Sequence, residues 1–215
     1  MSETTTTYKF EELIEPAKAK VREWYAQNTD SYWAECAIGN AKVEGRKRGF
    51  DIDDVQWSGF HSQGDGASWQ GGVLIRPFLD FHLKGDNPDF ARYTVLAELV
   101  DNEFVDDSFP IYRRAFMYNH SRTMQAERPT ADGAPHSTLQ KGILAGADSA
   151  ELYESIDIDD VIDRLTEWAL DEARSYADDI YKQLEKEYEY EMSDEHIQEI
   201  AEINEWRFDE DGYLA

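Results

Sequence analysis

The stretch SGFHSQGDGASWQGG, residues 58–72, decides the fold because it turns the chain between two strand-like runs. Apolar residues such as Ile52 and Trp57 mark the run at 51–60, and a second run begins at Ala67. An Asp-Gly pair between two such runs is a strong signal of a β-hairpin. We therefore predict a pair of antiparallel strands, with glycines adopting positive φ angles in the connection between them.

The same stretch carries more polar side chains than a hairpin needs, so a binding loop is an alternative interpretation. It lacks the Lys and Ser/Thr of a phosphate-binding loop and the glycine spacing of a dinucleotide fingerprint. It also lacks the alternating acids of an EF-hand. If the loop binds a ligand or a partner, the candidate contact residues are His61, Ser62, Gln63 and Asp65.

Two helices are predicted before the hairpin, where apolar residues recur every three or four positions. Pro16 suits the first turn of one helix, and Asp30 is a suitable N-cap for the other. We interpret the two as a helical hairpin, with Cys36 on the buried face of the second helix as a small hydrophobic residue.

The centre of the chain predicts further strands and one helix. A strand is expected at 67–83, bent or at a sheet edge because Pro77 interrupts it. Helical spacing follows at 88–104, and another strand is expected at 111–124. The residues from 127 to 146 are rich in glycine and proline and predict a loop, with an irregular strand near Ile143.

The C-terminal third predicts long acidic helices. An apolar stripe runs from Val161 to Leu184, and Ser193 can cap a shorter helix behind it. Helices outside a small antiparallel sheet of three to four strands give an α+β fold. We predict one domain over residues 1–215, of which 151–215 form the acidic helical part.

Charge is the strongest global property of the sequence. The chain has 46 Asp and Glu against 21 Lys and Arg, a net charge of −25. Residues 151–215 alone hold 23 acidic and 5 basic residues. Such a field repels phosphate backbones, so we expect no direct binding of nucleic acid. It attracts a protein with a basic surface, above all one that binds nucleic acid. Solubility or adaptation to salt is the alternative explanation of the composition.

The outer face of the long helix supplies the candidate partner-binding residues. Asp163, Glu167 and Asp171 repeat every four residues, which places neighbouring carboxylates ~6 Å apart. That spacing is comparable to the spacing of phosphates along one DNA strand, whereas a solvated helix face is the plainer interpretation. The full candidate set is Asp163, Glu167, Asp171, Glu172, Asp178 and Asp179.

No motif in the sequence predicts a catalytic residue, a metal or a cofactor. A metal site would have to assemble in space from His61, His82, His120 and Asp65. The alternative to a binding protein is a small-ligand or metal-dependent enzyme that uses His61, Asp65 and His120. The single cysteine excludes an internal disulfide. The sequence has no apolar run of membrane-spanning length and no signal-peptide pattern at its start, so we expect a cytoplasmic protein without a membrane partner.

Three stretches together resemble a family of small proteins found in phages, prophages and bacterial mobile elements. They are EPAKAKVREWY at 15–25, SGFHSQGDGASWQGG at 58–72 and YKQLEKEYEYEMSDEHIQEIAEINEWRFDEDG at 181–212. The members are commonly labelled "antitoxin of toxin–antitoxin stability system", and the region at 76–150 departs most from their pattern. The resemblance implies an accessory protein that neutralises another protein, such as a toxin, a nuclease or a defence complex.

The sequence leaves the oligomeric state open. A homo-oligomeric accessory protein is a third interpretation, in which aromatic residues such as Trp206 and Tyr213 would make the contacts between copies. It predicts a mass that depends on concentration and responds little to salt.

Overall fold

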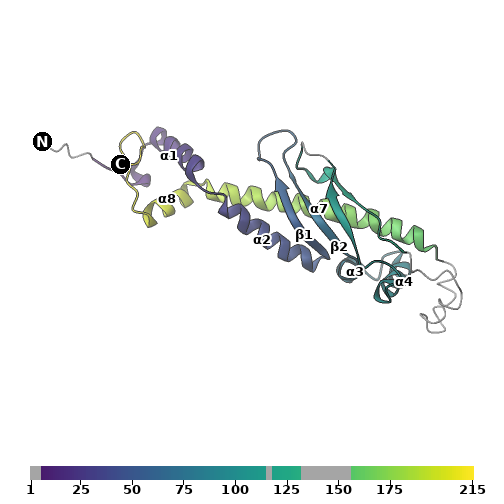
Figure 1. Ribbon diagram of the computed structural model, residues 1–215. Coiled ribbons are helices and arrows are strands. Elements are labelled where there is room, and N and C mark those ends of the chain that lie inside the picture. The colour runs from purple at the N-terminus through teal and green to yellow at the C-terminus, as the bar shows by residue number, and fades with distance from the viewer. Residues whose placement is uncertain (1–5, 115–117, 132–155) are drawn as a thin grey trace. The chain divides into compact units, whose positions relative to one another are not determined.

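The computed structural model describes residues 6–114, 118–131 and 156–215 (Figure 1). Its helices and strands are η1 (Phe10–Glu12), α1 (Glu15–Asn28), α2 (Tyr32–Lys47), β1 (Phe50–Trp57), β2 (Ala67–Leu74), α3 (Ile75–His82), α4 (Phe90–Asp101), β3 (Ser108–Arg113), η2 (Ser121–Thr123), β4 (Met124–Ala126), α7 (Ile158–Glu191) and α8 (Asp194–Ile203). None of these described helices is long and apolar enough to cross a membrane.

The chain divides into two compact units, and the divisions fall within α2 and α7. Residues 38–181 form a sheet unit. Residues 1–37 and 182–215 form a terminal unit, which joins the two ends of the chain.

The predicted α+β fold with a small antiparallel sheet is confirmed. The four strands are ordered β1-β2-β3-β4, and every neighbouring pair is antiparallel. The β1/β2 hairpin runs in register from Phe50 opposite Val73 to Trp57 opposite Ala67. The register shifts between Ile52 and Asp54, and such a bulge bends and twists an edge strand.

The core of the sheet unit lies on the sheet face that α2 and α7 cover. Trp69 is fully buried and donates a hydrogen bond from Nε1 to the Ala173 carbonyl of α7 at 3.2 Å. Phe50 packs against Trp69 and stacks on Tyr176. The Tyr176 hydroxyl donates to the Ala41 carbonyl of α2 at 2.6 Å, which ties both helices to this face.

The terminal unit has a core of its own, built from α1, α8 and the two chain ends. Tyr8 forms an antiparallel bridge with Phe208. The Arg22 guanidinium of α1 donates to both Asp194 carboxylate oxygens of α8, at 2.6 and 2.7 Å. The residues buried in this core are Phe10, Leu13, Ala17, Val21, Tyr25, Ile197, Ala201 and Phe208.

Pro77 does not interrupt a strand, contrary to the prediction. β2 ends at Leu74, and the chain continues directly into α3, in which Pro77 is the third residue. A proline is tolerated in the first helical turn because the N–H groups there have no intrahelical acceptor. Pro77 therefore marks the start of a helix. In the sequence, a proline after an apolar run looks the same whether it breaks a strand or begins a helix.

The strand predicted at 111–124 was also wrong in part. β3 ends at Arg113, the 3-10 helix η2 follows, and only then does β4 begin at Met124. Residues 115–117 of that prediction lie outside the described residues, as does the strand suggested near Ile143.

Cys36 is exposed rather than buried. Ala34 and Ala37 occupy the inward face of α2 at this point. Because Ala34, Cys36 and Ala37 are all small and lie within one helical turn, their sequence alone did not indicate which of them faces the core.

Candidate functional site

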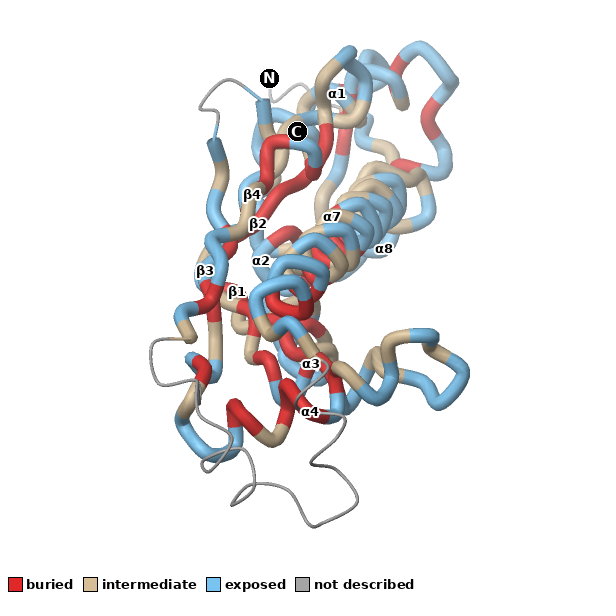
Figure 2. The backbone as a smooth tube through the Cα atoms, turned by 90° about the vertical axis from the view of Figure 1, so that its right-hand side faces the viewer, coloured by how far each residue is buried: buried red, intermediate tan, exposed pale blue. Residues whose placement is uncertain are grey.

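The outer face of α7 carries exposed carboxylates on a helix that is firmly held from its other side. Leu165, Ala169 and Ala173 are completely buried. Figure 2 shows buried and exposed positions alternating along α7. By helical spacing, one exposed set lies opposite the three buried residues and comprises Asp163, Glu167, Asp171 and Asp178. Because the buried side fixes the helix, these four acids keep a defined spacing.

Two of the four acids have arginine partners. Arg128 Nε lies 3.3 Å from an Asp163 carboxylate oxygen, and Arg174 lies 3.5 Å from Asp171. Glu167 and Asp178 have no ion pair within the described part of the chain. The acidic face is therefore least neutralised at Glu167 and Asp178.

The acids at the start of α7 have a structural role. Arg164 donates to Asp160 at 2.9 Å and lies 3.5 Å from Asp89, which precedes α4. These carboxylates raise the pKa of Arg164. The network connects α4 with α7, so this end of the helix offers less free charge to a partner.

Glu172 and Asp179, the other two acids of the predicted set, are placed differently. Glu172 is half-buried, accepts a bond from Trp168 Nε1 at 3.3 Å and lies 3.7 Å from His82 Nδ1. Burial lowers the pKa of His82, and the Glu172 carboxylate opposes that shift. Glu172 thus belongs to the contact between α7 and α3, whereas Asp179 is exposed.

The connection between β1 and β2, residues 58–66, is a closed loop rather than a two-residue turn. One Asp65 carboxylate oxygen accepts the backbone N–H of His61 at 3.0 Å and that of Ser62 at 2.6 Å. At the base, Ser58 N–H donates to the Gly66 carbonyl, and Gly66 N–H donates to the Ser58 hydroxyl. Asp65, which was predicted to contact a ligand or partner, therefore stabilises the backbone of its own loop.

Two glycines of the loop are required by a segment far along the chain. Gly64 has a φ of +98°, and a Cβ there would lie 3.0 Å from the Tyr118 ring. A Cβ on Gly66 would lie 2.8 Å from His120 Cβ. The segment at 118–120 therefore packs directly on the loop, and only glycine fits beneath it.

Aromatic residues anchor the loop on its other side. Phe60 stacks on Trp57 with 5.3 Å between ring centroids and lies 5.4 Å from the Tyr181 ring of α7. The Tyr181 hydroxyl donates to the Gly59 carbonyl at 3.0 Å. The loop is thus fixed, while the side chains of His61, Ser62 and Gln63 are exposed at its tip.

The structure brings His120 next to the loop that holds His61 and Asp65. His82 packs elsewhere, with 4.4 Å between its ring centroid and that of Phe78. Within the described residues, no group of three or more His, Cys, Asp or Glu side chains could hold a metal ion.

The contact of Tyr118 and His120 with the loop was missed by the sequence analysis. It joins segments more than fifty residues apart, and no local pattern reports such a contact. The glycines at 64 and 66 were the only signal, since they indicate that something approaches the backbone closely.

The range of the chain that matches a known family contains both candidate surfaces, the outer face of α7 and the loop at 58–66. The model of a domain of unknown function, DUF8835, matches residues 24–194. The chain belongs to this family. No curated protein and no solved structure matches the chain. The DUF8835 range contains the loop and all of α7, whereas η1 and nearly all of α8 lie outside it.

Proposed function

We propose that this member of DUF8835 is a phage or mobile-element accessory protein that binds and inhibits a host or rival protein. The observation that carries the proposal is the outer face of α7, where Glu167 and Asp178 stand exposed on a helix fixed by its buried side. A rigid face pays little ordering entropy when it binds.

The partner we propose is a protein whose basic surface handles nucleic acid, such as a toxin, a nuclease or a defence complex. The carboxylates would occupy the groove that otherwise holds phosphates, and their spacing of ~6 Å along the helix suits that role. The net charge of −25 would speed the encounter by electrostatic steering and would make it sensitive to salt.

The loop at 58–66 would be the second contact surface. Its tip presents hydrogen-bonding side chains at His61, Ser62 and Gln63, and Tyr118 beside it is half exposed. In this proposal, the charges of α7 attract the partner over long range, because charge mainly sets the association rate. The loop would then make short-range contacts through shape and hydrogen bonds.

The experiment is a capture of proteins from host lysate on the tagged full chain, at low and high salt. We expect a nucleic-acid-binding protein that is retained at low salt and lost at high salt. The triple variant Glu167→Gln, Asp171→Asn, Asp178→Asn should lose it at both. Absence of any such protein at low salt, or unchanged capture by the variant, would reject the proposal.

The enzyme alternative is favoured by one observation, the approach of His120 to the loop that holds His61 and Asp65. However, the Asp65 oxygen that would act as a base already accepts two backbone N–H groups. Metal analysis of the purified protein and ligand screens against Asp65→Asn would detect such an activity.

A further inference from the structure

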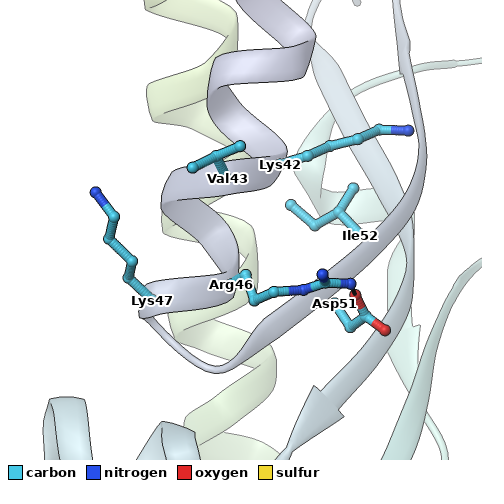
Figure 3. Close-up of a pocket in the computed structure, with 6 residues that line it drawn as sticks. All are labelled: Lys42, Val43, Arg46, Lys47, Asp51 and Ile52. Atoms are coloured by element: carbon cyan, nitrogen blue, oxygen red, sulfur yellow. Dashed lines mark hydrogen bonds and ion pairs between the residues drawn. The ribbon is translucent and has the colours of Figure 1, made fainter.

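A groove lies between α2 and β1 in the sheet unit (Figure 3). Its volume is about 610 Å³, within the ~300–1,000 Å³ that is typical of small-molecule sites. Four side chains come from the last two turns of α2 and two from the start of β1. They are Lys42, Val43, Arg46, Lys47, Asp51 and Ile52.

The lining of the groove is more basic than the chain as a whole. It holds three cations and one carboxylate in a protein of net charge −25. Of the three, Lys47 pairs with Glu44 at 2.9 Å and points away from the other two, so the charge of the groove comes from Lys42 and Arg46 (Figure 3). Lys42 and Arg46 are one helical turn apart and both extend toward β1, with Ile52 between them (Figure 3). Like charges at this spacing repel each other unless an anion lies near both.

Both cations keep unused donors. Lys42 Nζ donates to the Asp53 carbonyl at 2.6 Å, which occupies one of its three N–H groups. Arg46 pairs with Asp51 through one end of its guanidinium, and its side chain is 71% exposed. A guanidinium has five N–H donors, so this ion pair leaves a side of Arg46 available to a second anion.

The groove also offers apolar contact. Two apolar residues line it, Ile52, which is 7% exposed, and Val43 on α2, which is 65% exposed. A Cβ on Gly45 would lie 2.9 Å from Ile52 Cδ1, so the absence of a side chain at Gly45 permits the close approach of α2 to β1. An apolar surface beside two cations suits a ligand that has both an apolar body and an anionic end.

We propose that this groove binds a small organic anion, a carboxylate or a phosphate monoester attached to an apolar group. The anionic end would accept hydrogen bonds from the Lys42 ammonium and the Arg46 guanidinium, and the apolar body would cover Ile52 and Val43. The groove shares no lining residue with the α7 face or the loop, so its failure would leave the proposed partner binding untouched.

The test is an NMR titration of the labelled full chain with phenyl phosphate, benzoate, inorganic phosphate and phenol. We expect saturable shifts at Lys42, Arg46 and Ile52 with one of the two aryl anions, whose identity tells the phosphate from the carboxylate class. Inorganic phosphate and phenol should bind at least about tenfold more weakly, because each lacks one half of the recognised chemistry. Absence of saturable shifts with both aryl anions would overturn the proposal.

Charge-matched variants separate this site from general electrostatics. Arg46→Gln and Lys42→Gln should each weaken binding of the aryl anion about tenfold, the value of one charge-assisted hydrogen bond. Arg207→Gln removes the same charge from an exposed position of the terminal unit and should change binding little. Val43→Glu should abolish binding without disturbing the core, since Val43 is exposed. Equal weakening by Arg207→Gln would reject the site.

Discussion

The sheet unit and the terminal unit have similar net charges, but the sheet unit contains about twice as many residues. The terminal unit has 19 acidic and 7 basic residues, and the sheet unit has 27 and 14 in about twice the length. Charge density alone would therefore select the terminal unit as the binding part. The sheet unit offers something else, namely acids on a helix held by a four-stranded sheet and lying within the DUF8835 match.

The outer face of α8 in the terminal unit carries a row of exposed acids that can be compared directly with the row on α7. Glu195, Glu199 and Glu202 are exposed there at helical spacing, much like Glu167 and Asp171 on α7. If density of charge decides partner binding, neutralising either helix should have the same effect. If the position of the acids decides it, only α7 should matter.

The largest effect is expected from the core of the sheet unit. Trp69→Ala removes a fully buried ring and its hydrogen bond to Ala173, and we expect a loss of about 4 kcal/mol in the free energy of unfolding. Urea denaturation followed by circular dichroism measures it. A loss below about 1 kcal/mol would contradict the placement of Trp69 at the centre of this core.

The core of the terminal unit should respond more locally. Phe208→Ala empties a completely buried position, and we expect a loss of about 3 kcal/mol that is confined to this unit. Hydrogen exchange should then show lost protection in α1 and α8, with β1 and β2 unchanged. Equal loss in the strands would mean that the two units unfold as one.

The loop is expected to depend on its buried glycine. Gly66→Ala would press a methyl group against His120, and we expect a cost of about 2 kcal/mol together with altered signals of residues 118–120. Gly39→Ala on α2 is the matched control, because a Cβ there meets nothing within 4 Å. The control should be neutral or stabilising by up to about 1 kcal/mol, as alanine favours helix.

The units should also differ in their response to acid. Burial lowers the pKa of His82, so the unfolded state binds its proton first and the stability of the sheet unit declines as pH falls below about 6.5. The hydrogen bond from Arg22 lowers the pKa of Asp194, so its contribution is lost only below about pH 4. His82→Gln should flatten the decline that begins near neutrality in denaturation curves. An unchanged pH profile in that variant would exclude His82 as its source.

The smallest effect on stability is expected from the exposed acids. Glu167→Gln with Asp178→Asn should change the free energy of unfolding by less than about 0.5 kcal/mol, as should Glu195→Gln with Glu199→Gln. Thermal denaturation measures both pairs. A large loss for the α7 pair would assign these acids to the fold instead of to a partner.

The sequence predicted the elements whose signals are local. Asp65 and Gly66 indicated a β-hairpin, and β1 and β2 do form one, although the loop at 58–66 joins them in place of a two-residue turn. The apolar stripe that includes Leu165 indicated α7. The Ser193 cap was confirmed by its bond from His196 N–H at 3.2 Å. In each case, the signal lies in residues that are only a few positions apart in the sequence.

The sequence could not predict contacts between distant segments. Neither the packing of His120 on Gly66 nor the half-burial of Glu172 against His82 follows from spacing along one element. Helical spacing placed Asp163 and Asp171 on one face correctly, but their arginine partners at 128 and 174 had to come from the fold. The candidate face is therefore narrower than the sequence implied, because only Glu167 and Asp178 of its outer row lack an ion pair with another described residue.

The most direct test of the account compares two charge-matched variants in the capture experiment from host lysate. One carries Glu167→Gln, Asp171→Asn and Asp178→Asn on α7, and the other carries Glu195→Gln, Glu199→Gln and Glu202→Gln on α8. We predict that the α7 variant loses the salt-sensitive partner while the α8 variant retains it. Loss in both variants, or only in the α8 variant, would contradict the claim that the α7 face is the binding surface.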